Sequence, residues 1–187
     1  HGIKPIRWWL NRTLAQSKYG KTPTTQSLVY RETASNTNER TCIAAILPAG
    51  SVGAHTLSGV VLKNVKPEAA AVVLNSLCFD FALRLRTAGT HISFTYLRPM
   101  PVPVATATNA LPKVATLCAW KEAIGHITEL QAEWENLWLA NKAVAQAYGL
   151  TADDFAHILT TFPVFARKRS AFYAFLQERV ADWKAGR

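Results

Sequence analysis

Residues 30–48 read YRETASNTNERTCIAAILP and place a run of polar side chains between two apolar segments. The first apolar segment occupies residues 28–30, and the second occupies residues 42–47. Apolar and β-branched runs bounded by turn residues are typical of β-strands. Residues 31–41 therefore connect two expected strands of one sheet, and they carry ten side chains that can form hydrogen bonds, two of them arginines.

The composition of this connection fits two interpretations. Ser, Thr and Asn are common in turns because their side chains bond to nearby backbone groups, so the segment fits a polar hairpin loop. Arg and Asn are also the side chains that pair bidentately with guanine and adenine edges, so it fits a segment that reads DNA. Composition alone leaves both interpretations open.

The chain that follows alternates between expected strands and one long helix. Residues 57–63 form a third strand candidate, and Pro67 and Glu68 suit the first turn of a helix that we expect to end near residue 86. That helix is apolar nearly all round, which predicts that it is buried. Residues 91–97 alternate polar and apolar side chains and predict a return strand.

One polar stripe interrupts the expected helix. It consists of Ser76, Asp80 and Arg84 at a spacing of four residues. Asp80 and Arg84 can form an ion pair along this stripe, since side chains four residues apart lie on the same helix face. The alternative is that Arg84 and Arg86 reach a phosphate, and the sequence favours neither interpretation.

The segment at residues 99–112 is rich in proline, alanine and threonine and marks a boundary, beyond which the chain is expected to be helical. Apolar residues at steps of three and four then predict a coiled-coil-like helix, packed either within the chain or on another helix of a parent protein. Its seam comprises Ile127, Leu130, Trp134, Leu137, Asn141, Val144 and Tyr148.

Two further helix signals follow this seam. Thr151 and Asp154 predict a capping box at the start of a short helix that Pro163 stops. The basic triplet at residues 167–169 is expected to begin the last helix. A basic first turn opposes the helix dipole, so the triplet fits either a solvated turn or a phosphate partner.

The whole chain has 187 residues, a formal net charge of +9 and a pI near 9.7. Such a surplus suits phosphate backbones or anionic membranes, and no run of about 18 apolar residues predicts a membrane span.

Cys42, Cys78 and Cys118 lie far apart in apolar segments, which predicts reduced core thiols in a cytoplasmic protein. The spacing of cysteines and histidines predicts no metal site. We interpret His1-Gly2 as an expression remnant on an excised fragment.

Three blocks of the sequence resemble one protein family. The first block is Arg31 followed by TNERT at residues 37–41. The second is NSL at residues 75–77 with Phe79-Asp80, Arg84, GTH at residues 89–91 and a proline-rich exit, and the third is AYGL at residues 147–150 with Phe162-Pro163. In this order they resemble the C-terminal, target-recognising part of Eco57I-type adenine-specific DNA methyltransferases of restriction-modification and phage-defence systems. The resemblance covers about residues 28–165.

The resemblance implies that the chain binds double-stranded DNA as the sequence-reading part of a site-specific adenine-N6 methyltransferase. Such enzymes hold S-adenosylmethionine and grip the target base with an Asn/Asp-Pro-Pro-Tyr/Phe loop, and neither signature occurs here. We therefore expect no catalytic residue, cofactor or metal in this chain, and an upstream methyltransferase domain in the same polypeptide. The residues expected to contact DNA are Arg31, Asn36, Asn38, Arg40, Thr41, Lys63, Arg84, Arg86 and His91.

These observations predict an α+β fold in which a small mixed sheet with packed helices, as in a target recognition domain, precedes a helical part. We divide the chain into a lead-in at residues 1–27, a core at 28–104 and a helical tail at 105–187.

Arg40 has two interpretations, a base contact beside Asn38 or an internal ion pair with Glu32, Glu39 or Asp80. The alternative function is a non-enzymatic interaction or scaffold module that docks a partner through its helical tail.

Overall fold

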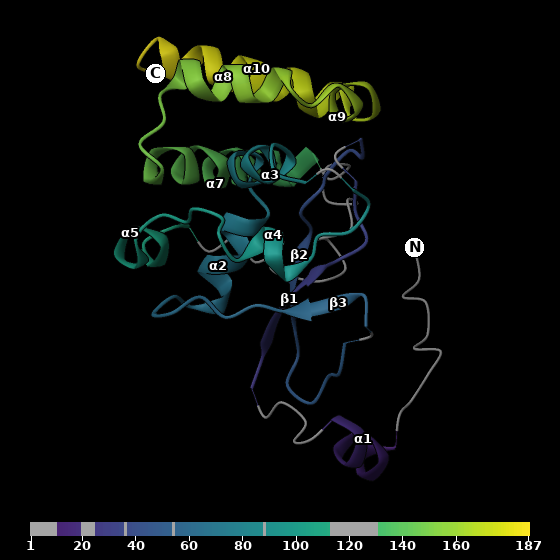
Figure 1. Cartoon of the computed structure of the whole chain (residues 1–187). Coiled ribbons are helices and arrows are strands. Elements are labelled where there is room, and N and C mark those ends of the chain that lie inside the picture. Colours follow the sequence, from purple (N-terminus) through teal and green to yellow (C-terminus); the bar gives the residue numbers. More distant parts are fainter. Residues whose placement is uncertain (1–10, 20–24, 36, 54, 88, 113–130) are drawn as a thin grey trace.

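The computed structural model describes residues 11–19, 25–35, 37–53, 55–87, 89–112 and 131–187. Three strands, β1 (Ser27–Arg31), β2 (Ala44–Leu47) and β3 (Leu57–Gly59), form a sheet with β1 in the centre (Figure 1). The predicted α+β class is confirmed. We expected a mixed sheet, but both strand pairs in the described residues are antiparallel, because β2 and β3 flank β1 and both run opposite to it.

Helices make up most of the remaining described chain. Their bounds are α1 Arg12–Tyr19, α2 Pro67–Leu74, α3 Leu77–Arg84, α4 Phe94–Leu97, α5 Ala105–Asn109, a 3₁₀ turn Gln131–Glu133, α7 Trp134–Ala147, α8 Ala152–Thr160, α9 Pro163–Lys168 and α10 Ser170–Lys184. Among the described residues, no helix has the length and apolar composition that a bilayer span requires.

The single helix expected at residues 66–86 is two helices, α2 and α3, separated at Asn75 and Ser76. The Asn75 amide bonds to the N–H and C=O of Ala44 at 2.9 and 2.8 Å, which draws the chain toward β2. The Ser76 hydroxyl accepts a hydrogen bond from the Phe79 N–H and caps α3. The prediction that this region is buried is confirmed, since residues 69–80 are all buried.

The strand expected at residues 91–97 is wrong. His91 forms one isolated bridge with Thr33, and the chain then turns into the short helix α4 after Ser93. The alternating pattern placed Ile92, Phe94 and Tyr96 on one buried face, but the Phe94 side chain is 57% exposed and that of Tyr96 37%. An alternation over six residues was too short to separate a strand from a helical turn.

The C-terminal helices form two layers beside the sheet. Figure 1 shows α8, α9 and α10 in an outer layer over α3 and α7, with the sheet on the other side of α3. The described part of the predicted seam faces into the chain, because Leu137, Asn141 and Val144 are buried and Trp134 packs on Phe172 at 5.4 Å between ring centroids. Ile127 and Leu130 lie outside the described residues.

Helix α8 begins with the predicted capping box. The hydroxyl of Thr151 accepts from the N–H of Asp154, and the carboxylate of Asp154 accepts from the N–H of Thr151. These hydrogen bonds hold the pKa of Asp154 below its usual range, because they stabilise the charged carboxylate. The capping prediction is confirmed.

The basic triplet is not in the first turn of the last helix. Pro163 begins α9 rather than only ending α8, because proline suits the first turn of a helix. Arg167 and Lys168 consequently fall in the last turn of α9, and Arg169 precedes α10. One cluster of buried side chains extends from Leu28 to Val180 through the sheet and these helices.

Candidate nucleic-acid interface

The polar loop, residues 33–40, is fixed to α3 by the carboxylate of Asp80. This side chain is 0% exposed and accepts hydrogen bonds from Nε of Arg40 at 2.7 Å and from Nε of Arg84 at 3.0 Å. The backbone N–H of Thr41 completes the set at 3.0 Å. Two guanidinium groups and one N–H thereby compensate the buried charge.

Arg40 connects the end of the polar loop to the junction between α2 and α3. Its Nη2 atom donates to the carbonyl oxygens of Asn75 at 2.6 Å and Ser76 at 3.2 Å. Of the two interpretations open from the sequence, the structure contains the internal ion pair, and the partner is Asp80. Nε and Nη2 of the guanidinium are occupied by these contacts, so the position of Arg40 is that of a structural residue of the loop.

Arg84 binds the backbone of the polar loop from α3. Its Nη2 atom donates to the carbonyl oxygens of Asn38 at 2.8 Å and Glu39 at 3.0 Å. The predicted pairing with Asp80 is present, and the guanidinium also lies 4.2 Å from the centroid of the Phe162 ring. Arg84 is therefore held by α3, the polar loop and the start of α9, and its position is that of a structural residue.

Thr41 requires a correction. The sequence placed its side chain among the DNA contacts, but Thr41 is 0% exposed. Its hydroxyl donates to the carbonyl oxygen of Ser35 at 3.0 Å, within the polar loop. A fully buried hydroxyl with an internal partner has no access to a base edge, so Thr41 shapes the loop.

The polar loop presents a small set of side chains to solvent. Thr37 and Asn38 are exposed, and the Ser35 and Thr37 hydroxyls bond to each other at 2.8 Å. The Asn38 N–H donates to the Ser35 carbonyl oxygen, which tightens the turn. Asn36 lies outside the described residues. Asn38 thereby exposes an amide, the group that can pair with an adenine edge.

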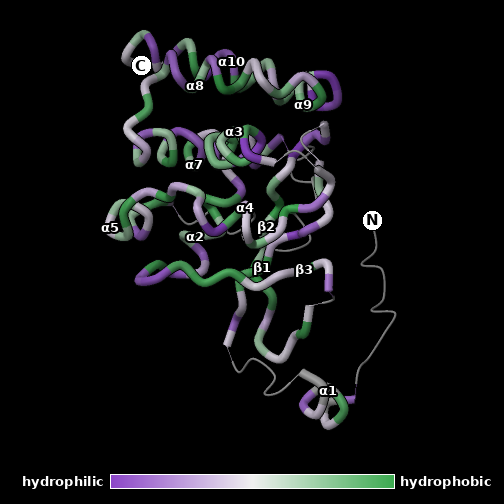
Figure 2. Tube along the Cα trace, viewed as in Figure 1, coloured by the Kyte–Doolittle hydropathy of each residue, from purple (hydrophilic) through white to green (hydrophobic). Residues whose placement is uncertain are grey.

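Helix α9 meets the polar loop through a long-range ion pair. Nε of Arg169 lies 2.8 Å from Oε1 of Glu39, although the two residues are 130 positions apart. Three segments therefore converge, namely the polar loop, the C-terminal end of α3 and the C-terminal end of α9 (Figure 1). Figure 2 shows hydrophilic residues along the loops at this end of α3.

Exposed cations surround this convergence. Arg86 follows the end of α3, and Arg167 and Lys168 occupy the last turn of α9. Among the described residues, none of these three has an ion-pair partner in the structure. His91 is exposed as well, and its bridge with Thr33 places it at the edge of the polar loop.

Two predicted contact residues lie apart from this group or have restricted access. Lys63 is exposed but belongs to the connection between β3 and α2, which is anchored to α5 by the bond from Asn109 Nδ2 to the Asn64 carbonyl oxygen. Arg31 ends β1 and is half-buried, and its Nε atom has no hydrogen-bond partner among the described residues. Asn38 thus lies in the polar loop, Arg86 and His91 lie on segments that adjoin residues in contact with that loop, and Lys63 lies on a different segment.

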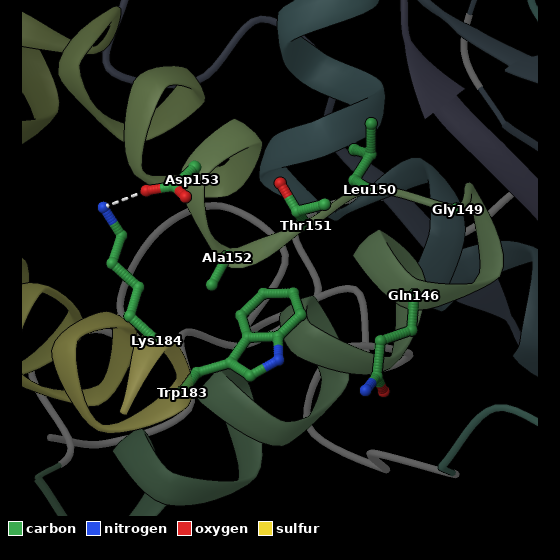
Figure 3. Close-up of a pocket in the computed structure, with 8 residues that line it drawn as sticks. All are labelled: Gln146, Gly149, Leu150, Thr151, Ala152, Asp153, Trp183 and Lys184. Atoms are coloured by element: carbon green, nitrogen blue, oxygen red, sulfur yellow. Dashed lines mark ion pairs between the residues drawn. The ribbon is translucent and has the colours of Figure 1, made fainter. Parts of the chain in front are cut away.

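A hollow lies between the start of α8 and the end of α10 (Figure 3). The Trp183 ring forms one side, and Lys184 pairs with Asp153 at 2.6 Å across it. The Thr151 hydroxyl is committed to the capping box. The charged groups of this hollow are thus already paired with each other. Within the described ranges, no three His, Cys, Asp or Glu side chains are grouped to hold a metal ion.

Comparison of the chain with protein-family models, with curated proteins and with solved structures gave no match in any of the three.

Proposed function

We propose that this chain binds duplex DNA in a sequence-dependent manner. The observation that carries the proposal is the polar loop itself, whose exposed Asn38 is held in place by a hydrogen bond from Arg84 to its carbonyl oxygen. Direct readout requires few side chains at fixed geometry, and a loop fixed before binding loses less conformational entropy on binding. Arg40 and Arg84 supply that rigidity, and Asn38 supplies the base contact.

Phosphate contacts would come from the exposed cations beside the loop. Arg86 is two residues beyond Arg84 and borders the segment that Arg84 supports. Phosphate contacts position a protein on the duplex, whereas contacts to base edges specify the sequence. This division matches the arrangement of one neutral amide next to flexible cationic side chains.

We further propose that the chain is the target-recognition part of a site-specific adenine-N6 DNA methyltransferase of a restriction-modification or related defence system. The support is the family resemblance together with one physical observation. Arg40 of the first resembling block bonds to Asp80 of the second, and Arg84 of the second bonds back to Asn38 of the first. The two blocks therefore hold each other's conformation, which gives a physical reason for them to occur together in one protein.

Under this proposal the chain itself performs no chemistry. S-adenosylmethionine and the methyl transfer belong to an upstream domain of the same polypeptide, as in the resembling family. The alternative of an interaction module rested on a seam free to dock a partner. Leu137, Asn141 and Val144 of that seam are buried within the chain, so the described part of the seam is not open to a partner.

The test is selection of bound duplexes from a random-sequence library, followed by affinity measurements over a range of salt concentrations. We expect enrichment of one short sequence and a linear fall of log K with log salt concentration, because bound phosphates release counterions. Absence of enrichment together with salt-independent binding would reject sequence-dependent DNA binding. Binding of S-adenosylmethionine to the isolated chain in calorimetry would reject the assignment of the cofactor to an upstream domain.

A further inference from the structure

The last turn of α9 carries two cations that the contacts described above do not use. Arg169 is paired with Glu39, but Arg167 and Lys168 are exposed and have no ion-pair partner among the described residues. Because consecutive Cα atoms are 3.8 Å apart, both residues lie within about 8 Å of Arg169 along the backbone. They therefore stand near the residue that fixes α9 to the polar loop.

The Arg169–Glu39 ion pair has two effects on this region. It sets the distance between α9 and the polar loop, since Nε and Oε1 are 2.8 Å apart and both side chains are mostly buried. It also compensates the acidic side chain of Glu39, which would otherwise oppose an approaching phosphate. What remains exposed at the end of α9 is cationic, and its position relative to Asn38 is fixed by the fold.

We propose that Arg167 and Lys168 form a second phosphate-binding segment that holds the DNA backbone beside the bases addressed by the polar loop. This inference rests on the proposed function and deepens it, because it assigns a backbone contact to the helical part of the chain. Arg86 beyond the end of α3 and the two cations of α9 then contact phosphates of the same duplex whose bases Asn38 addresses. The ligand is the phosphodiester backbone of duplex DNA.

The experiment compares two double variants that remove equal charge, Arg167→Gln/Lys168→Gln and Lys66→Gln/Lys184→Gln. Lys66 and Lys184 are exposed too, but Lys66 immediately precedes α2 and Lys184 ends α10, and both of these helix ends lie away from α9 in Figure 1. Affinity of the whole chain for one short duplex is measured at several salt concentrations. Each lost phosphate contact lowers the slope of log K against log salt concentration by about 0.9, so we expect the α9 variant to lose about 1.8.

The lysine variant should keep the slope of the original chain, and Arg167→Lys/Lys168→Arg should keep it as well because the charges remain. Unchanged far-ultraviolet circular dichroism shows that each variant is folded. An unchanged slope in the α9 variant, or an equal loss in both double variants, overturns the inference while leaving DNA binding in place. If the original chain shows no salt-dependent duplex binding, the proposed function fails first and the inference fails with it.

Discussion

Nε of Arg40 lies 2.7 Å from Oδ2 of Asp80, although the two residues stand 40 positions apart in the chain. Asp80 is fully buried, while the Arg40 side chain retains 23% of its exposure. The contact joins the last residue of the polar loop to the middle of α3. The conformation of the loop therefore depends on a carboxylate inside the protein.

Replacement of Arg40 by alanine should destabilise the fold. Removing one partner of a buried ion pair leaves an uncompensated charge, and we expect a loss of about 3 kcal/mol, since Arg84 and the Thr41 N–H still contact Asp80. Urea denaturation of Arg40→Ala against Arg86→Ala measures the effect. Arg86 is exposed, so its replacement should change stability by no more than about 0.5 kcal/mol. An Arg40→Ala variant that keeps full stability but loses discrimination between duplexes would show instead that Arg40 contacts a base.

Replacement of Asn38 by alanine should affect specificity and leave stability unchanged. Asn38 takes part in the loop contacts described above through its backbone alone, and its exposed side-chain amide can meet a base edge. We expect a loss of about 1–3 kcal/mol in affinity for the selected duplex and little change for an unrelated duplex. Gln177→Ala, which removes an exposed amide from α10, serves as the control. Equal weakening on both duplexes would mean that Asn38 reads no base.

Replacement of Thr151 by alanine should weaken the start of α8. The hydroxyl of Thr151 satisfies the N–H of Asp154, and loss of such a cap costs about 1 kcal/mol. Thermal unfolding of Thr151→Ala and Thr160→Ala makes the comparison. Thr160 is exposed at the other end of α8, where its hydroxyl bonds to the His157 carbonyl oxygen. If both variants unfold at the same temperature, the cap contributes nothing to global stability.

The thiols of Cys42 and Cys78 should resist alkylation in the native protein at pH 8. Burial raises the pKa of Cys78 to about 12 and also raises that of Cys42, so neither forms the reactive thiolate. A thiol in the unfolded chain ionises near pH 8.5. The buried, protonated thiol of Cys78 therefore contributes fully to the stability of the fold below about pH 8.5. This contribution is lost as the pH rises from there toward about 12.

Iodoacetamide treatment with and without guanidinium, followed by peptide mass spectrometry, makes the test. Both cysteines should be modified only in denaturant. Modification of Cys78 at the same rate in native and denatured samples would show that the packing around α3 opens readily.

Local signals in the sequence were enough to predict several elements. The apolar runs predict the three strands, the steps of three and four predict α7, and Thr151 with Asp154 predicts the start of α8. Each of these depends on neighbours within a few residues. The break between α2 and α3 was not predicted, because Asn75 turns away from the helix toward Ala44, 31 positions distant.

The candidate site was predictable in part for the same reason. Arg84 and Asp80 are four residues apart, so their pairing was among the expected alternatives. The pairing of Arg169 with Glu39 spans 130 positions and could not be derived from any local pattern. Pro163 was interpreted as the end of one helix, and its second role as the start of α9 shifted the basic triplet by a whole turn.

The bond between Asn75 and Ala44 also limits the size of the sheet. Tyr30 lies opposite Ala44, and the adjacent bond from the Arg31 N–H to the Ile43 carbonyl oxygen means that the N–H and C=O of Ala44 point away from β1. An open strand edge of this kind is a template onto which another chain can add. The Asn75 amide satisfies both groups with a donor and an acceptor like those of a peptide unit, so at Ala44 it takes the place of a neighbouring strand and prevents another chain from pairing at this position of the β2 edge.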